Sequence, residues 1–143
     1  MQHTIDIHIE WGDCDPARIV FYPNYFRWFD HGTRHLFESV GLTLRTLFDE
    51  YRVIGIPLLD ARAEFLYPCR FGDRVQLASQ IEKWHRKTLL VTHELYNGEH
   101  LAVRGQEIRA WAEQHPDDPA RLRTVPIPAE IRQRFTIPSK TES

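Results

Sequence analysis

A long amphipathic segment, residues 23–40, constrains the fold of this chain more than any other feature. Pro23 suits the first turn of a helix, and Gly41 suits the position just after the last turn. At about 100° per residue, apolar side chains gather on one face of this helix and charged side chains lie opposite. The apolar set is Tyr25, Phe29, Leu36 and Val40, and the charged set is Arg27, Arg34 and Glu38. The helix therefore needs an apolar surface on which to pack.

Most of the remaining chain has the alternating pattern of β-strands and supplies that surface. Residues 4–11 alternate strictly between apolar and polar side chains, from Ile5 to Trp11, which predicts a half-buried strand ending at Gly12. The dipeptide Asn97-Gly98 predicts a tight hairpin. The same analysis predicts further strands at residues 59–65, 75–81, 88–95 and 101–112.

The shorter segments complete a single domain that spans residues 1–143. Residues 43–51 predict a short helix capped by Thr43, and Pro128 is placed to begin another near the C-terminus. Residues 113–124 read as a loop. Hairpin-linked strands form an antiparallel sheet, and the long helix must bury its apolar face against it. The sequence therefore predicts an α+β fold. Because such a sheet has free edges, we also expect at least a dimer.

Composition and motif content exclude several classes of function. With 18 Lys and Arg against 20 Asp and Glu, the net charge of −2 argues against a nucleic-acid-binding protein. The seven glycines are never two or five residues apart, so neither a dinucleotide-binding fingerprint nor a P-loop is present. No Gly-x-Ser-x-Gly nucleophile motif occurs either. His31 and His35 have the spacing of a metal pair but no evident third ligand, so we expect no metal site.

The cysteine content and the hydropathy pattern bear on location. Cys14 and Cys69 are too few for a disulfide framework, which favours a reducing compartment. The N-terminal residues are polar where a signal peptide would be apolar. No apolar run approaches the roughly 20 residues needed to cross a bilayer. We therefore expect a soluble, cytoplasmic protein with no membrane partner.

The most informative segment is residues 11–30, where Asp15 lies on a loop that leads into the long helix. Helix N-termini carry unpaired amides and a partial positive charge, which suits a developing oxyanion. Because Pro23 has no N–H, the donors at this end are the amides of Tyr22, Asn24 and Tyr25.

A carboxylate facing a carbonyl polarised in this way is a layout for hydrolysis. Asp15 would either attack the carbonyl or activate a water molecule. The alternative is that Asp13 or Asp15 only shapes a turn before Pro16, since aspartate is common in turns.

Within this segment, Gly12-Asp13-Cys14-Asp15-Pro16-Ala17 is followed by Ile19-Val20-Phe21-Tyr22-Pro23-Asn24-Tyr25 and then by Arg27-Trp28. This run closely resembles the 4-hydroxybenzoyl-CoA thioesterase family of hotdog-fold proteins. The resemblance continues more weakly through Gly55, Pro57, Trp84, Arg86 and Lys87. It implies a five-stranded antiparallel sheet wrapped around one long central helix. It also implies dimers and usually tetramers, with active sites between subunits.

The resemblance also implies roles for individual residues. The family's catalytic aspartate falls on Asp15, and its carbonyl-polarising backbone amide falls on Tyr22. The family's nucleotide-contacting basic segment covers Arg86 and Lys87. Basic residues suit this role, since flexible cations bind the phosphates of coenzyme A. The alternative for this pair is a solvated hairpin end. One departure is Arg18, which stands where close relatives have glycine.

Asp30 is the remaining candidate. The resemblance implies that an acidic residue here accepts a hydrogen bond from a hydroxyl on an aromatic acyl group. The alternative is a helical ion pair with Arg34, four residues later. Exposed pairs of this kind contribute little to stability.

The sequence therefore predicts an acyl-CoA thioesterase that hydrolyses an aromatic, hydroxybenzoyl-type CoA thioester without a metal or redox cofactor. One alternative is a thioesterase of the same fold for short aliphatic acyl-CoA or acyl-carrier substrates. Another is a module that binds CoA ligands without turnover. We expect a homodimer or homotetramer. The sequence leaves open whether Asp15 acts as nucleophile or general base, and which acyl group is bound.

Overall fold

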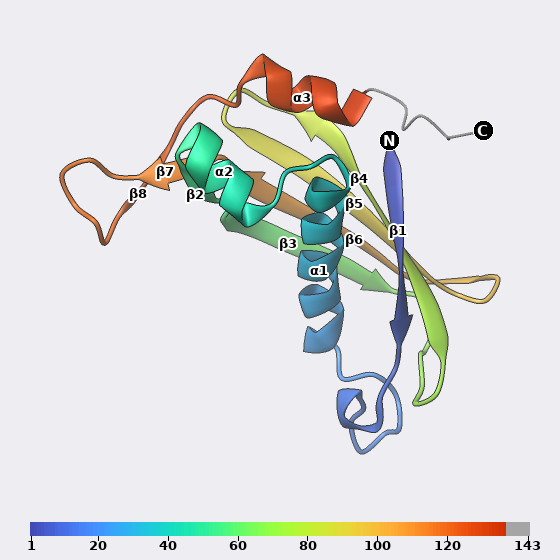
Figure 1. Ribbon diagram of the computed structural model, residues 1–143. Helices are drawn as coiled ribbons and strands as arrows, with labels where there is room; N and C mark the ends of the chain where they lie inside the picture. Colours follow the sequence, from blue (N-terminus) through green and yellow to red (C-terminus); the bar gives the residue numbers. More distant parts are fainter. Residues whose placement is uncertain (137–143) are drawn as a thin grey trace.

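The computed structural model describes residues 1–136, and its centre is an antiparallel sheet of five strands with the order β1-β4-β5-β6-β3. The strands are β1 (Gln2–His8), β3 (Leu58–Phe65), β4 (Arg74–Trp84), β5 (Thr88–Asn97) and β6 (His100–Ala110). The long helix α1 (Pro23–Ser39) lies across one face of this sheet (Figure 1). The predicted α+β architecture is therefore confirmed.

Helix α1 begins at the predicted residue and ends at Ser39, one residue before the predicted end. Pro23 is its first residue, and Gly41 has the left-handed backbone expected just beyond the end, with φ of 83°. Its apolar face is buried against the sheet. The ring of Phe29 lies so close to β6 that a Cβ at Gly105 would be 2.3 Å from it. Glycine at position 105 therefore permits the close approach of helix and sheet.

The hairpin and both shorter helices are confirmed, with small shifts. Asn97 pairs with His100, so the two turn residues are Gly98 and Glu99, one position later than predicted. Helix α2 (Leu44–Tyr51) is capped by Thr43, whose hydroxyl accepts a hydrogen bond from the Thr46 amide at 3.1 Å. Helix α3 (Ala129–Thr136) follows Pro128 directly.

The first strand begins and ends earlier than predicted. Residues 4–11 alternate in sequence, but β1 ends at His8, and Trp11–Asp13 form a single 3-10 turn, η1. The Asp13 carboxylate accepts a hydrogen bond from the Glu10 amide at 2.8 Å, which turns the chain away from the sheet. Trp11 is consequently 78% exposed instead of continuing the buried face.

The predicted loop at residues 113–124 was wrong in part. It contains most of β7 (Ala112–Gln114) and all of β8 (Leu122–Thr124), which pair with each other. With β2 (Val53–Gly55) they form a second, three-stranded sheet beside α2. Three-residue strands are too short for alternation to indicate them. Within residues 1–136, no helix is long and apolar enough to cross a membrane.

Candidate active site

The loop between β1 and α1 is held in one shape by its own backbone. Cys14 and Val20 form an isolated antiparallel bridge, and the Phe21 amide donates to the Asp13 carbonyl at 2.8 Å. The Asp15 amide donates to the Ile19 carbonyl at 2.9 Å. The segment therefore doubles back on itself and delivers the chain to the first residue of α1.

The two aspartates of this loop differ in how their carboxylates are used. Asp13 is fully engaged, because Oδ2 accepts from the Glu10 amide and Oδ1 from Arg27 Nη2 at 3.1 Å. Asp15 Oδ1 accepts from the Ala17 amide at 2.8 Å, so this side chain does shape the turn. Asp15 Oδ2, however, has no hydrogen-bond partner among residues 1–136. The turn-forming and chemical interpretations of Asp15 are therefore compatible.

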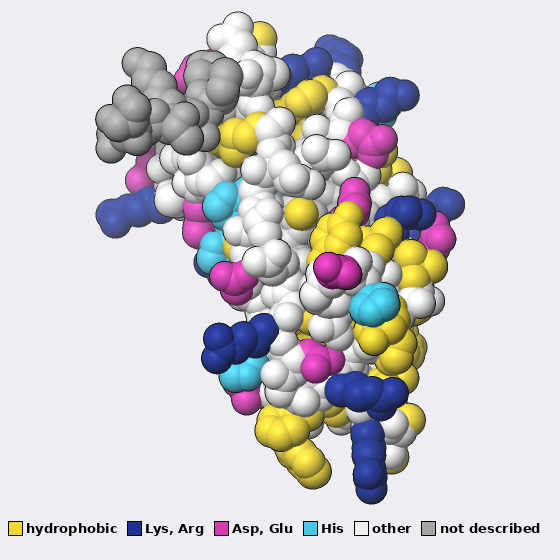
Figure 2. Space-filling model, turned by 90° about the vertical axis from the view of Figure 1, so that its right-hand side faces the viewer, with side chains coloured by type: hydrophobic (Ala, Val, Ile, Leu, Met, Phe, Trp, Pro, Cys, Tyr) yellow, Lys and Arg dark blue, Asp and Glu magenta, His cyan; other side chains and the backbone are white. Residues whose placement is uncertain are grey.

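Asp15 borders a surface depression of about 710 Å³. Its lining residues are Trp11, Cys14, Asp15, Pro16, Arg18, Arg70 and Phe71. The rings of Trp11 and Phe71 meet edge to face at 5.6 Å and form an apolar wall. Figure 2 shows hydrophobic side chains beside Lys and Arg side chains at the lower end of the molecule, where the β1–α1 loop lies in Figure 1. The depression thus combines a carboxylate, two cations and an aromatic surface.

Arg18 has an unusual backbone conformation in this depression. Its φ is +66°, in the left-handed region that glycine adopts readily and other residues adopt at a cost. The sequence resemblance implies glycine at this position, and Arg18 has the backbone conformation that glycine favours.

Of the three backbone amides predicted to polarise a carbonyl, two already have acceptors in the structure. The Asn24 amide donates to the Phe21 carbonyl at 3.0 Å, and the Tyr25 amide donates to the Tyr22 carbonyl at 3.1 Å. Within the described residues, the Tyr22 amide has no acceptor. Tyr22 lies at the N-cap of α1, where the partial positive charge of the helix is greatest.

Asp30 pairs with Arg109, and not with Arg34 as the alternative interpretation expected. Its Oδ1 accepts from Arg109 Nη2 on β6 at 2.8 Å, whereas Arg34 pairs with Glu38 at 3.2 Å. The Asp30 side chain is 64% exposed and that of Arg109 only 8%. Both border a second, largely apolar cavity of about 310 Å³ between α1, α2 and β2.

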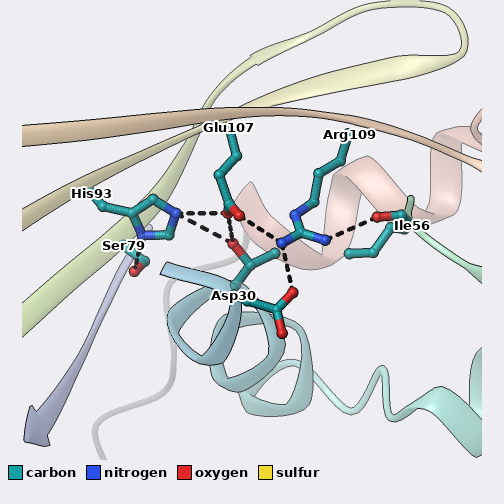
Figure 3. Close-up of polar contacts among 7 residues, drawn as sticks. Asp30, Ile56, Ser79, His93, Glu107 and Arg109 are labelled. Carbon is teal, nitrogen blue, oxygen red and sulfur yellow. Dashed lines mark hydrogen bonds and ion pairs between the residues drawn. The ribbon is translucent and has the colours of Figure 1, made fainter. Parts of the chain in front are cut away.

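Arg109 belongs to a buried polar layer that the sequence analysis missed (Figure 3). Glu107 Oε2 lies 2.6 Å from Arg109 Nη2, and its Oε1 lies 2.8 Å from His93 Nε2. Thr33 on α1 donates to the same Oε1 at 2.5 Å, and Ser79 Oγ lies 2.7 Å from His93 Nδ1.

This layer separates two apolar clusters of the core. On β5, Val91 belongs to one cluster and Leu95 to the other, with His93 between them. A signal for the layer does exist in the sequence. Ser79 and His93 interrupt the apolar side of otherwise alternating strands, at positions where a half-buried strand has apolar side chains.

The charges in the layer are set by its hydrogen bonds. Burial alone would raise the pKa of Glu107, but hydrogen bonds from His93 and Arg109 outweigh burial and lower the pKa to about 2. Burial would likewise lower the pKa of Arg109, and its bonds to Glu107 and Asp30 raise it instead. The layer therefore contains a carboxylate and a guanidinium that are both ionised.

Arg86 and Lys87 lie far from Asp15 within one chain. They occupy the turn between β4 and β5, next to α3. Arg132 on α3 donates a hydrogen bond to the His85 carbonyl in this turn at 2.8 Å. The β1–α1 loop lies at the opposite end of the sheet (Figure 1). Because Arg74 at the start of β4 pairs with His8, the length of β4 separates the two regions by about 30 Å.

In the described part of the chain, no three His, Cys, Asp or Glu side chains are close enough together to hold a metal ion.

The fold and the loop define the class to which this chain belongs. Residues 9–135 match the family model of the thioesterase-like superfamily, so the chain is a member of that superfamily and has its hotdog fold. Within it, the chain belongs to the family of 4-hydroxybenzoyl-CoA thioesterase. It is 35% identical to that enzyme of Pseudomonas sp. (strain CBS-3) over 133 residues, which cover 89% of this chain and 92% of the enzyme. The predicted family is therefore confirmed.

Further relatives act on other aromatic CoA thioesters. The chain is 25% identical to 1,4-dihydroxy-2-naphthoyl-CoA hydrolase of Thermosynechococcus vestitus, covering 87% of this chain and 91% of that protein. A solved structure of an aspartate-to-asparagine variant of 4-hydroxybenzoyl-CoA thioesterase, complexed with 4-hydroxybenzoyl-CoA, matches with a TM-score of 0.87 and 32% identity. That match covers 94% of this chain and 98% of the other. A gentisyl-coenzyme A thioesterase matches with a TM-score of 0.78 and 28% identity, over 94% of this chain and 100% of the other.

Proposed function

We propose that this protein hydrolyses an aromatic, hydroxybenzoyl-type CoA thioester to the free acid and CoA. The observation that carries the proposal is that Asp15 borders a depression beside the start of α1 and that its Oδ2 accepts no hydrogen bond from residues 1–136. The names of the relatives support the substrate class, since they act on hydroxybenzoyl, gentisyl or dihydroxynaphthoyl thioesters of CoA. That the substrate complex was obtained with an aspartate-to-asparagine variant supports an aspartate as the reacting group.

In the proposed reaction, the Tyr22 amide donates a hydrogen bond to the thioester oxygen and stabilises the negative charge that develops there. Asp15 then has two routes open to it. As nucleophile, its carboxylate adds to the carbonyl carbon, the CoA thiolate leaves, and water hydrolyses the resulting anhydride. As general base, it takes a proton from a water molecule that attacks the same carbon. Single-turnover hydrolysis in H₂¹⁸O identifies the first route when water attacks the aspartyl carbon of the anhydride, because the label then enters the Asp15 carboxylate and the acid carries ¹⁶O from Asp15. Rapid chemical quenching, which traps a covalent aroyl-enzyme, identifies it when water attacks the aroyl carbon instead.

The spacing of Tyr22 and Asp30 supports an aromatic acyl group with a distal hydroxyl. The two residues are eight positions apart on the helix, which is a rise of about 12 Å. The Asp30 side chain leans toward the helix N-terminus, which shortens the gap to the Tyr22 amide. A 4-hydroxybenzoyl group with a hydrogen bond of about 2.8 Å at each end is long enough to span the gap between the Tyr22 amide and Asp30. A butyryl group has no donor to offer Asp30.

We further propose that the complete site needs a second copy of the chain. The roughly 30 Å along β4 exceeds the reach of CoA from its sulfur to its phosphates, so Arg86 and Lys87 would serve an Asp15 in another subunit. The edge strand β3 carries exposed apolar side chains, including Leu58, Leu59 and Phe65, which suits pairing between copies. This proposal implies a homodimer or homotetramer. We also propose that the protein is cytoplasmic, which the free thiols of Cys14 and Cys69 support.

The proposal is tested by measuring hydrolysis of 4-hydroxybenzoyl-CoA, benzoyl-CoA and butyryl-CoA, with light scattering of the same sample. We expect the highest kcat/KM for the hydroxybenzoyl thioester, and the mass of a dimer or tetramer. A preference for butyryl-CoA would favour a short-chain thioesterase. Binding of all three thioesters without turnover would favour a module that only binds CoA ligands. Full activity at the mass of a monomer would contradict the shared site.

A further inference from the structure

Arg109 reaches from the buried polar layer to an exposed carboxylate on α1. Its guanidinium donates through Nη1 to the Ile56 carbonyl at 3.0 Å, and through Nη2 to both Glu107 and Asp30. The side chain therefore connects the core of the sheet, the residue that follows β2 and the long helix, as Figure 3 shows.

The inner end of this connection is fixed. Glu107 is 2% exposed and is bonded to Thr33 and His93 as well as to Arg109. His93 is bonded in turn to Ser79. Because each of these partners is buried on a different element, Arg109 has no freedom to follow its outer partner.

Asp30, at the outer end of this connection, keeps one carboxylate oxygen available as a hydrogen-bond acceptor. Only Oδ1 of Asp30 bonds to Arg109, and Oδ2 accepts no hydrogen bond from residues 1–136. An unpaired, exposed aspartate samples several rotamers, whereas one held at Oδ1 has a defined direction for its second oxygen. Asp30 also borders the largely apolar cavity between α1 and α2, so its side chain lies at the edge of an apolar space.

The contribution of the Arg109–Asp30 ion pair to folding stability does not explain why the pair is present. An ion pair with a partner that is 64% exposed contributes little to folding. Burying the guanidinium has a cost, since Arg109 Nε is buried and has no partner within the described residues. Buried ion pairs are often no more stable than apolar side chains of the same volume. A role in positioning gives these side chains a function that an apolar pair could not supply.

We propose that Arg109 is a positioning residue that aims Asp30 at the substrate and thereby sets the preference for acyl groups with a distal hydrogen-bond donor. This inference rests on the proposed function. A site built to bond a substrate hydroxyl discriminates strongly against the analogue that lacks it, because the site's own polar group is then left without a partner. Without Arg109, Asp30 is free to turn to solvent and the discrimination weakens.

The test is the ratio of kcat/KM for 4-hydroxybenzoyl-CoA to kcat/KM for benzoyl-CoA. We expect Arg109→Gln to lower this ratio by roughly tenfold, mainly through the hydroxylated substrate. Asp30→Ala should lower it by a similar factor. If Arg109 acts through Asp30, adding Arg109→Gln to Asp30→Ala changes the ratio less than about twofold. Arg104→Gln, which removes an exposed cation from the same strand, is the matched control and keeps the wild-type ratio.

A wild-type ratio in Arg109→Gln, or independent effects in the double variant, would overturn the positioning role. Should Arg109→Gln fail to fold, Arg109→Met combined with Glu107→Gln replaces it, because this pair leaves no unpaired buried charge and no donor for Asp30; an unchanged ratio in that variant overturns the proposal equally. Absence of thioester hydrolysis in the wild-type protein would instead refute the proposed function.

Discussion

The carboxylate of Glu107 lies 2.6 Å from the guanidinium of Arg109, and both side chains are almost completely buried. Their charges compensate each other in the core, where the two side chains lie on either side of Ile108 along β6. Breaking such a pair from one side leaves an unpaired buried charge. The pair is therefore sensitive both to substitution and to pH.

Acidification should weaken the fold through Glu107. Its pKa in the folded protein is about 2, below the ordinary value of 4.5. The ionised form is therefore favoured by folding, so its contribution is complete above pH 4.5 and is lost as the pH falls toward 2. We expect Glu107→Gln to lower the free energy of unfolding at pH 7 by on the order of 3 kcal/mol.

Urea unfolding at several pH values between 5 and 2 measures this effect. The free energy of unfolding should fall with pH less steeply in Glu107→Gln than in the wild type. Glu99→Gln, on the hairpin turn, serves as the control and should keep the wild-type slope. Parallel curves for the wild type and Glu107→Gln would show that this carboxylate is not the group responsible.

A methyl group at position 105 should destabilise the fold by forcing α1 away from β6. A Cβ there would lie 2.3 and 2.4 Å from two atoms of the Phe29 ring. Overpacking of this kind costs about 1–3 kcal/mol, so we expect Gly105→Ala to unfold at a temperature several degrees below the wild type. Gly55→Ala is the control, because a Cβ at Gly55 meets nothing within 4 Å. Equal melting temperatures for the two variants would be incompatible with the observed packing.

Replacing Arg18 by glycine should stabilise the protein. Its φ of +66° costs an L-residue roughly 1–2 kcal/mol, which exceeds the added entropy of glycine in the unfolded chain. We expect Arg18→Gly to raise the free energy of unfolding by about 0.5–1 kcal/mol. Arg70→Gly, in the same depression but without a left-handed backbone, should lower it. Chemical denaturation measures both, and a loss of stability in Arg18→Gly would contradict the prediction.

The parts of the fold that the sequence predicts are those encoded by neighbouring residues. Pro23 and Gly41 mark the ends of α1 because their backbone preferences are local, and the hairpin at Gly98 follows from the same kind of signal. Asp15 could be singled out because its loop leads directly into the helix. The choice between Asp13 and Asp15 rested on resemblance, and only their hydrogen bonds separate them.

The parts that the sequence does not predict depend on contacts between distant residues. Asp30 and Arg109 are 79 positions apart, so the nearer Arg34 was the natural partner to consider. The buried layer draws Thr33, His93 and Glu107 from three separate elements, and no single segment has a pattern that reports their meeting. The separation of Arg86 from Asp15 likewise follows from the sheet register alone.

The most direct test of the proposed chemistry is the hydrolysis of 4-hydroxybenzoyl-CoA by Asp15→Asn, with binding of the intact thioester measured by calorimetry. We expect kcat to fall by about 10²–10⁴ while the dissociation constant changes little, because asparagine keeps the turn but neither attacks the carbonyl nor takes a proton from water. Asp6→Asn, an exposed substitution on β1, should retain full activity. A kcat for Asp15→Asn equal to that of the wild type would contradict the role assigned to this residue.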